Sequence, residues 1–256
     1  MAGKLIPVTD LHCHILPGID DGARDAEMSE FLLNSEKEQG VRQILFTPHF
    51  YADETDAEGF IKRRNAAYEK MRPVIQKLKL KTSLGAEVRM QEELFDLDLS
   101  KMRLGDTHYL LLEWPFQMET YPMWGEDLVD LLLRQGIRPL FAHIDRYRYF
   151  LNDPDKLDHF MRKGCLFQIN ADSLLGRYRS SKVLSLIEKG YVHVIASDAH
   201  HPERRPVNLI AAMDCAAAKL GGHTADYLLR NADAIYRGLE IYPMEKSRKR
   251  HFFDLF

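Results

Sequence analysis

The chain has 256 residues, of which 45% are hydrophobic and 29% are charged, so a substantial core is available and general disorder is excluded. Its formal net charge of -3 argues against a protein that mainly grips nucleic acid phosphates. No apolar stretch approaches the roughly 20 residues that cross a bilayer, and no signal-peptide pattern opens the chain. We therefore expect a globular, cytoplasmic protein without a transmembrane segment that binds no nucleic acid.

Strand-like apolar runs alternate with longer helical patterns along the chain, which favours an α/β fold with a mainly parallel sheet. The expected strands are 6–11, 43–47, 82–87, 109–114, 139–143, 165–170 and 193–197. The expected helices are 26–39, 57–78, 124–135, 154–163, 181–189 and 207–220. Several of these helical patterns are followed by a glycine, the residue favoured just after a helix end. No linker composition marks an internal boundary, so we expect one domain over 1–245 and a basic tail over 246–256.

Pairs of side chains of the types that bind metal ions lie at the carboxyl ends of the first and last expected strands. His12 and His14 lie two residues apart, and Asp198 and His200 repeat that spacing. Side chains two apart in a strand share a face and can point at one ion. One such pair alone is weak support, because a strand can carry it by chance, but two pairs at opposite ends of the sheet make chance a poor explanation.

Three further candidates, His49, Glu87 and His143, follow or end other strands. The carboxyl ends of barrel strands are where active sites are built. Any one of these residues alone is more simply a buried side chain bonded to the backbone. Together with the two pairs they predict a metal centre of imidazole and carboxylate ligands, suited to manganese, zinc or iron, with enough ligands for two or three ions.

Two carboxylates are less certain from position alone. Asp20 and Asp21 share the loop after the first strand, where either could be a helix-entry or turn residue instead of a ligand, and Asp21 is a plausible further ligand. Glu113, near the end of the 109–114 run, could be a ligand, a partner that orients an imidazole, or a surface residue.

Arginines near the ligands indicate an anionic substrate. Arg146 lies three residues after His143, and Arg205 lies five after His200. Guanidinium groups match phosphate oxygens, although Arg204 beside Arg205 leaves that choice open. Cysteine-based phosphatases place an arginine six residues after the nucleophile, and no cysteine here has one. The pattern predicts a metal-dependent phosphoesterase.

These residues resemble the motifs of the PHP (polymerase and histidinol phosphatase) superfamily, in the same order. More narrowly, three stretches resemble the CpsB/YwqE group of bacterial tyrosine phosphatases: DLHCHILPGIDDG at 10–22, AHIDRY at 142–147 and ASDAH at 196–200. The similarity runs from about residue 8 to residue 240. Asp145 departs from the glutamate that the group commonly has before its arginine.

The resemblance implies a distorted (β/α)7 TIM-like barrel, the PHP fold, with a trinuclear centre usually associated with manganese. It implies activity on phosphotyrosine of the kinases that govern capsule or exopolysaccharide export. By motif, Arg146 and Arg205 would bind phosphate. The three ions would be held by His12, His14, Glu87 and Asp198, by Glu87, Glu113 and His143, and by Asp21, His49 and His200.

We expect metal-activated water to attack phosphorus in line, without a covalent phosphoenzyme. Three rivals stay open. A histidinol-phosphate phosphatase, or another small-molecule phosphatase of the superfamily, would keep the metals. An amidohydrolase-like enzyme often has a strand-end lysine, which this chain lacks. A catalytically silent metal-binding scaffold would lose ligands, whereas none is missing here.

Overall fold

The computed structural model describes residues 6–116, 120–176 and 180–241, so the expected 246–256 tail and the domain boundary at 245 lie outside the described residues. The strands are β1 (Val8–Cys13), β2 (Val41–Phe46), β3 (His49–Phe50), β4 (Lys81–Leu84), β5 (Glu87–Arg89), β6 (Tyr109–Glu113), β7 (Arg138–Phe141), β8 (Leu166–Asn170) and β9 (Val194–Ala196).

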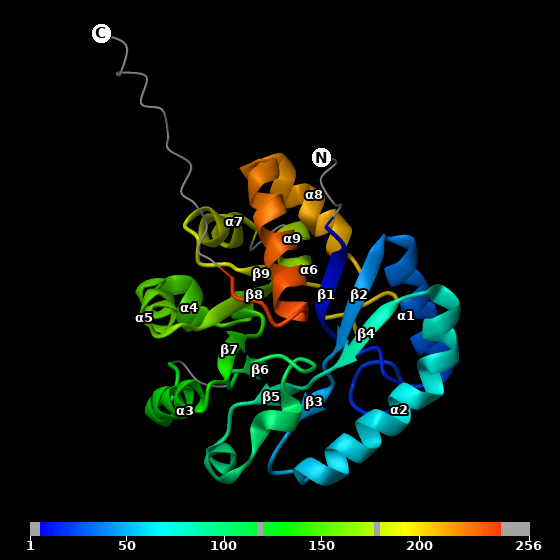
Figure 1. Cartoon of the computed structure of the whole chain (residues 1–256). Coiled ribbons are helices and arrows are strands. Elements are labelled where there is room, and N and C mark those ends of the chain that lie inside the picture. Colours follow the sequence, from blue (N-terminus) through cyan, green and yellow to red (C-terminus); the bar gives the residue numbers. More distant parts are fainter. Residues whose placement is uncertain (1–5, 117–119, 177–179, 242–256) are drawn as a thin grey trace.

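Helices surround these strands (Figure 1). They are α1 (Ala26–Glu38), α2 (Ala57–Leu78), α3 (Met123–Arg134), α4 (Arg148–Asn152), α5 (Asp155–Lys163), α6 (Ala171–Leu175), α7 (Ser180–Glu188), α8 (Leu209–Leu220) and α9 (Gly222–Tyr236). Three short 3-10 segments, η1 (Glu92–Asp96), η2 (Leu99–Met102) and η3 (Ile144–Arg146), lie in the connections. In the described chain no helix combines the length and apolar character that a membrane span requires.

All strand pairs are parallel, in two sheets ordered β1-β2-β4 and β3-β5-β6-β7-β8-β9. The sheets are continuous through two broken strands, because β3 follows β2 and β5 follows β4 after two residues each. The segment after β9 returns to β1, where the His14 amide donates to the Ala199 carbonyl at 2.9 Å. Seven strand positions thus form a distorted barrel, as expected from the resemblance.

One expected strand, 82–87, is wrong as a continuous strand. It ends at Leu84, and Glu87 begins β5 in the other sheet. A Cβ at Gly85 would lie 2.9 Å from the Leu104 side chain, so the break depends on close approach that glycine alone allows. Glu87 therefore starts a strand rather than ending one.

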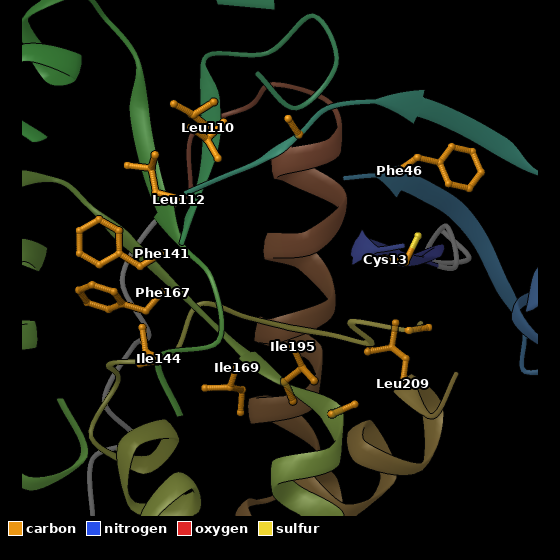
Figure 2. Close-up of a cluster of buried hydrophobic side chains, with 14 of the residues drawn as sticks. Cys13, Phe46, Leu110, Leu112, Phe141, Ile144, Phe167, Ile169, Ile195 and Leu209 are labelled. Atoms are coloured by element: carbon orange, nitrogen blue, oxygen red, sulfur yellow. The ribbon is translucent and has the colours of Figure 1, made fainter. Parts of the chain in front are cut away.

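Two apolar layers hold the barrel. The outer layer packs strand side chains under the surrounding helices, and Figure 2 shows Phe141 and Phe167 side by side within it, with ring centroids 5.6 Å apart. The inner layer joins Leu11, Leu45 and Leu140 to Ala232 and Ile235 of α9. Helix α9, which the sequence reasoning did not predict, thus covers the inside of the barrel at the amino ends of the strands, opposite the expected metal centre.

The six expected helices are confirmed, with ends shifted by two residues or fewer. Local chemistry explains where two of them begin, since the Asp25 and Asp56 side chains accept hydrogen bonds from the amides of Met28 and Gly59. Gly164, after α5, has a φ of 105°, the left-handed conformation expected of a residue that ends a helix.

Candidate metal centre

The structure brings all nine predicted ligands to one end of the barrel. His12 comes from β1 and His14 follows it directly, while His49 comes from β3, Glu87 from β5 and Glu113 from β6. His143 follows β7, Asp198 and His200 follow β9, and Asp21 lies in the loop after β1. All are buried except Asp21, which is exposed, and His49, which is intermediate.

The donor atoms form four overlapping groups, and within each group they lie within 4.8 Å of one another. The groups are His14, Asp21, His49 and His200; His12, His14 and Glu87; His12, His143 and Asp198; and His49, Glu87 and Glu113. Glu87 is central, since its Oε2 lies 3.1 Å from the nearest ring nitrogens of His12, His14 and His49. A separation near 3 Å is what neighbouring ligands round one ion show when each binds at about 2.1 Å.

The nine candidate ligands together are called the ring below. Several of its atoms lack a hydrogen-bond partner among the described residues, although they are buried. They are Glu87 Oε2, Asp198 Oδ1, His49 Nδ1, His143 Nδ1 and His200 Nε2. Buried polar groups are normally satisfied, so such a concentration at one point fits residues that bind cations. The mixture of imidazole and carboxylate suits manganese, iron or zinc.

Neighbouring charges in this group of ligands shift the pKa values of Glu87 and His14. Burial raises the pKa of Glu87, but the imidazoles of His12, His49 and His143 outweigh burial and hold that pKa well below its ordinary value. Burial lowers the pKa of His14, but Asp20 and Glu87 outweigh it and raise that pKa well above its ordinary value. The raised pKa of His14 favours its protonated form, and a cation that binds His14 would displace that proton, so metal binding should release protons.

Asp20 and Asp21, which sequence reasoning left open, take different positions. Asp20 Oδ2 lies 2.7 Å from His14 Nδ1 and accepts from the His49 amide at 3.0 Å. Asp21 Oδ1 faces the ring, 3.4 Å from His49 Nε2 and 3.3 Å from His200 Nε2. Asp20 thus orients His14 and leaves its Nε2 for a cation, while Asp21 can ligate.

Gln168 and Asn170 of β8 orient other candidate ligands and were missed by the sequence reasoning. Gln168 Oε1 accepts from the His143 amide at 2.7 Å and lies 3.1 Å from His12 Nδ1. Its Nε2 donates to Asn170 Oδ1 at 2.9 Å, and Asn170 Nδ2 donates to Asp198 Oδ2. Their signal was available, since two amide side chains with strand spacing lie in an otherwise apolar run.

Two candidate ligands have strained backbones. His143 has a φ of 32° and Asp198 a φ of 52°, and among the described non-glycine residues only Lys79 shares a positive φ. Such conformations cost on the order of 1–3 kcal/mol and gather at functional sites. The strain turns both side chains into the ring directly after their strands end.

The two predicted arginines meet at the outer oxygen of Asp198. Arg205 Nη2 contacts Asp198 Oδ2, and Arg146 Nη1 lies 3.8 Å from the same atom. Asp145, where the group commonly has glutamate, is buried and turned away from the ring, since its carboxylate accepts from the Asn170 amide at 3.0 Å and from the Ser173 hydroxyl. Both arginines are partly exposed, so they can reach an anion that approaches the ring.

Aromatic rings border the centre on two sides. Phe116, 43% exposed, stacks on His143 with centroids 5.3 Å apart, and the Arg146 guanidinium lies 4.5 Å from its centroid. Tyr51 stacks on His49 at 5.1 Å and helps to line a cavity of about 420 Å³ that also contacts Asp21. The ring therefore opens to solvent beside aromatic side chains, neither of which was predicted.

Comparison with known proteins identifies relatives of this chain. The family described as "Capsular polysaccharide synthesis, CpsB/CapC" matches residues 8–237. Tyrosine-protein phosphatase YwqE of Bacillus subtilis (strain 168) is 32% identical over 255 residues, covering 96% of this chain and 99% of that protein. Tyrosine-protein phosphatase CpsB of Streptococcus pneumoniae is 30% identical over 235 residues, covering 86% and 93%.

A solved structure is similar to this chain in both sequence and fold. It belongs to the work titled "Crystal structures of YwqE from Bacillus subtilis and CpsB from Streptococcus pneumoniae, unique metal-dependent tyrosine phosphatases". It superposes with a TM-score of 0.82 at 30% identity, covering 92% of this chain and 97% of the other. Sequence and fold together show that the chain belongs to the CpsB/CapC family of capsular polysaccharide synthesis.

Proposed function

We propose that this chain is a metal-dependent phosphatase that hydrolyses phosphotyrosine in proteins. One observation carries the proposal: two guanidinium groups converge on Asp198 at the rim of a ring of nine metal-type side chains. Phosphate is the anion that such a combination binds best. The names of YwqE and CpsB, and the description of their structures as metal-dependent tyrosine phosphatases, support the same activity.

The proposed cofactor is a cluster of two or three ions, manganese first, with iron or zinc as alternatives. The proposed ligands are His12, His14, Asp21, His49, Glu87, Glu113, His143, Asp198 and His200. Glu87 belongs to two of the four donor groups, so its carboxylate can bridge two ions. When bound, the ions would supply Lewis-acid chemistry and lower the pKa of a water molecule.

Arg146 and Arg205 would bind the oxygens of the phosphoryl group. Both arginines contact the Asp198 carboxylate. An incoming phosphate would replace this carboxylate as the anionic partner of their guanidinium groups. Charge that develops on these oxygens in the transition state would meet donors already in position. Phe116 and Tyr51 would lie beside the aromatic ring of the substrate.

A cysteine nucleophile is not part of the proposal. Cys13 points away from the ring, and its thiol faces the carbonyl of Leu45 at 3.5 Å. Burial raises the pKa of Cys13 well above its ordinary value, so the thiolate that attacks phosphorus in cysteine phosphatases would not form. Direct attack by water, without a covalent phosphoenzyme, follows as the proposed route.

The proposed protein substrate is a bacterial tyrosine kinase that controls capsule or exopolysaccharide synthesis. The family description supports this context. The described cysteines are free, which suits a reducing compartment, and the proposed location is the cytoplasm.

The test is phosphate release from a phosphotyrosine peptide by metal-stripped protein resupplied with manganese. Phosphoserine peptide and histidinol phosphate are compared at equal concentration. We expect manganese-dependent release from phosphotyrosine, lost in His12→Ala and Arg205→Ala but retained in Arg204→Ala, the neighbouring arginine outside the ring. Preference for histidinol phosphate would overturn the substrate, and inactivity with every metal would favour a non-catalytic scaffold.

A further inference from the structure

A second cavity, of about 560 Å³, lies away from the metal centre between α2, β4 and η2. Its lining includes the basic residues Arg64, Lys101 and Arg103 and the hydroxyl groups of Tyr68 and Ser83. Neither the proposed chemistry nor the predicted ligands use any of them.

Arg64 is the unusual member of this lining. Its side chain is buried, with only 6% of the residue exposed. Its Nη1 donates to the carbonyl of Gly85 at 2.8 Å and to that of Lys101 at 3.4 Å. Its Nε donates to Asn65 Oδ1 at 3.4 Å, and its guanidinium carbon lies 5.6 Å from the centroid of the Phe60 ring. Burial lowers the pKa of Arg64 to about 10, and no acidic neighbour opposes the shift.

The rest of the lining adds positive charge rather than compensating it. Arg103 donates from Nε to the Ser100 carbonyl at 2.8 Å. The charge of Asp98, which lies outside the lining, acts on both Lys101 and Arg103. The acidic residue of the lining, Asp106, is exposed. The hydrogen-bond acceptors of Arg64 are thus neutral oxygens, and two further cations line the same cavity, so the charge of the cavity favours an anion.

We propose that this cavity is a second anion site that binds a small phosphate-like oxyanion through Arg64, Lys101 and Arg103. The Tyr68 and Thr82 hydroxyls are hydrogen-bonded to each other at 2.9 Å, so one of them, together with the Ser83 hydroxyl, can donate to the remaining oxygens. The site lies behind the metal centre, because Arg64 also holds the carbonyl of Gly85, two residues before Glu87. It does not depend on the reaction catalysed at the ring.

Isothermal titration calorimetry of inorganic phosphate into the metal-loaded full chain tests the proposal. Arg64 also supports the backbone, so the variant is Lys101→Ala/Arg103→Ala, which spares it. We expect two binding events in the unchanged chain, one at the metal centre and one here. The variant should keep the first and weaken the second by on the order of a hundredfold, about tenfold for each lost charged contact.

The matched control is Lys62→Ala/Lys70→Ala, which removes the same charge from the exposed side of α2. It should keep both events, and inhibition of peptide hydrolysis by phosphate should be the same in all three proteins. A single event in the unchanged chain would overturn the proposal. So would two undiminished events in the cavity variant, or an equal loss in the control, which would indicate general charge rather than a site.

Discussion

Replacement of Gln168 by methionine tests whether the buried amide network prepares the ring for cations. Methionine keeps the length of the side chain but removes the acceptor for the His143 amide and the donor to Asn170. Each buried polar group left unsatisfied costs about 1–3 kcal/mol, so we expect a loss of roughly 2–6 kcal/mol in unfolding free energy. His12 also loses the partner of its Nδ1, and loss of such an orienting contact lowers metal affinity about 10–100-fold.

Two measurements separate these effects. Urea unfolding of the metal-free protein gives the stability loss, and titration with manganese, followed by bound metal per chain, gives the affinity. The matched control is Gln43→Met, since Gln43 is also buried but bonds Thr9 on the side of the barrel away from the ring. Manganese affinity that falls equally in both variants, or in neither, would refute the role of Gln168.

Three further predictions concern titration and substrate contact. Burial lowers the pKa of His193 from its ordinary 6.5 to about 3, so the stabilising contribution of its neutral imidazole is complete above pH 6.5 and falls as pH drops toward 3. Urea unfolding of the metal-free protein at pH 7 and pH 5 gives the loss of unfolding free energy on acidification. That loss should be about 2 kcal/mol smaller in His193→Asn. Burial and Asp10 raise the pKa of Glu36, so the free-energy cost of ionising this buried carboxyl grows as pH rises above about 4.5. The melting temperature of Glu36→Gln should therefore exceed that of the parent by more at pH 8 than at pH 5. Phe116→Ala should raise KM for a phosphotyrosine peptide on the order of tenfold with unchanged manganese content, whereas an unchanged KM would exclude contact with the substrate ring.

Local physical reasons predicted the α/β fold with parallel strands and the convergence of the ligands, whereas the distorted barrel was implied by the family resemblance. Helices 26–39 and 57–78 have periodic apolar faces and aspartate caps, and their ends are nearly right. The two-residue spacing of His12 and His14 predicts that both side chains lie on the same side of the chain, because a strand places alternate side chains on one face. Parallel strands then bring distant ends to one edge of the sheet.

What could not be predicted depends on contacts between distant segments. Whether Asp20 or Asp21 faces the ring is decided by how the loop folds over His14, where a Cβ on Gly22 would lie 2.1 Å from the His14 carbonyl oxygen. The network of Gln168 and Asn170 becomes visible only when β7, β8 and the end of β9 are side by side. The buried charge of Arg64 similarly appears only once α2 is packed against β4 and η2.

Phosphotyrosine hydrolysis measured against the number of metal ions bound per chain tests whether the nine candidate ligands form a catalytic metal centre. Metal-stripped protein is loaded stepwise with manganese, and bound metal and phosphate release are measured on the same samples. The account predicts no release without metal and a rate that rises as the ring fills with two or three ions, with His12→Ala binding fewer ions and releasing little. Full activity in the stripped protein, or a filled ring with no hydrolysis of phosphotyrosine, would contradict it.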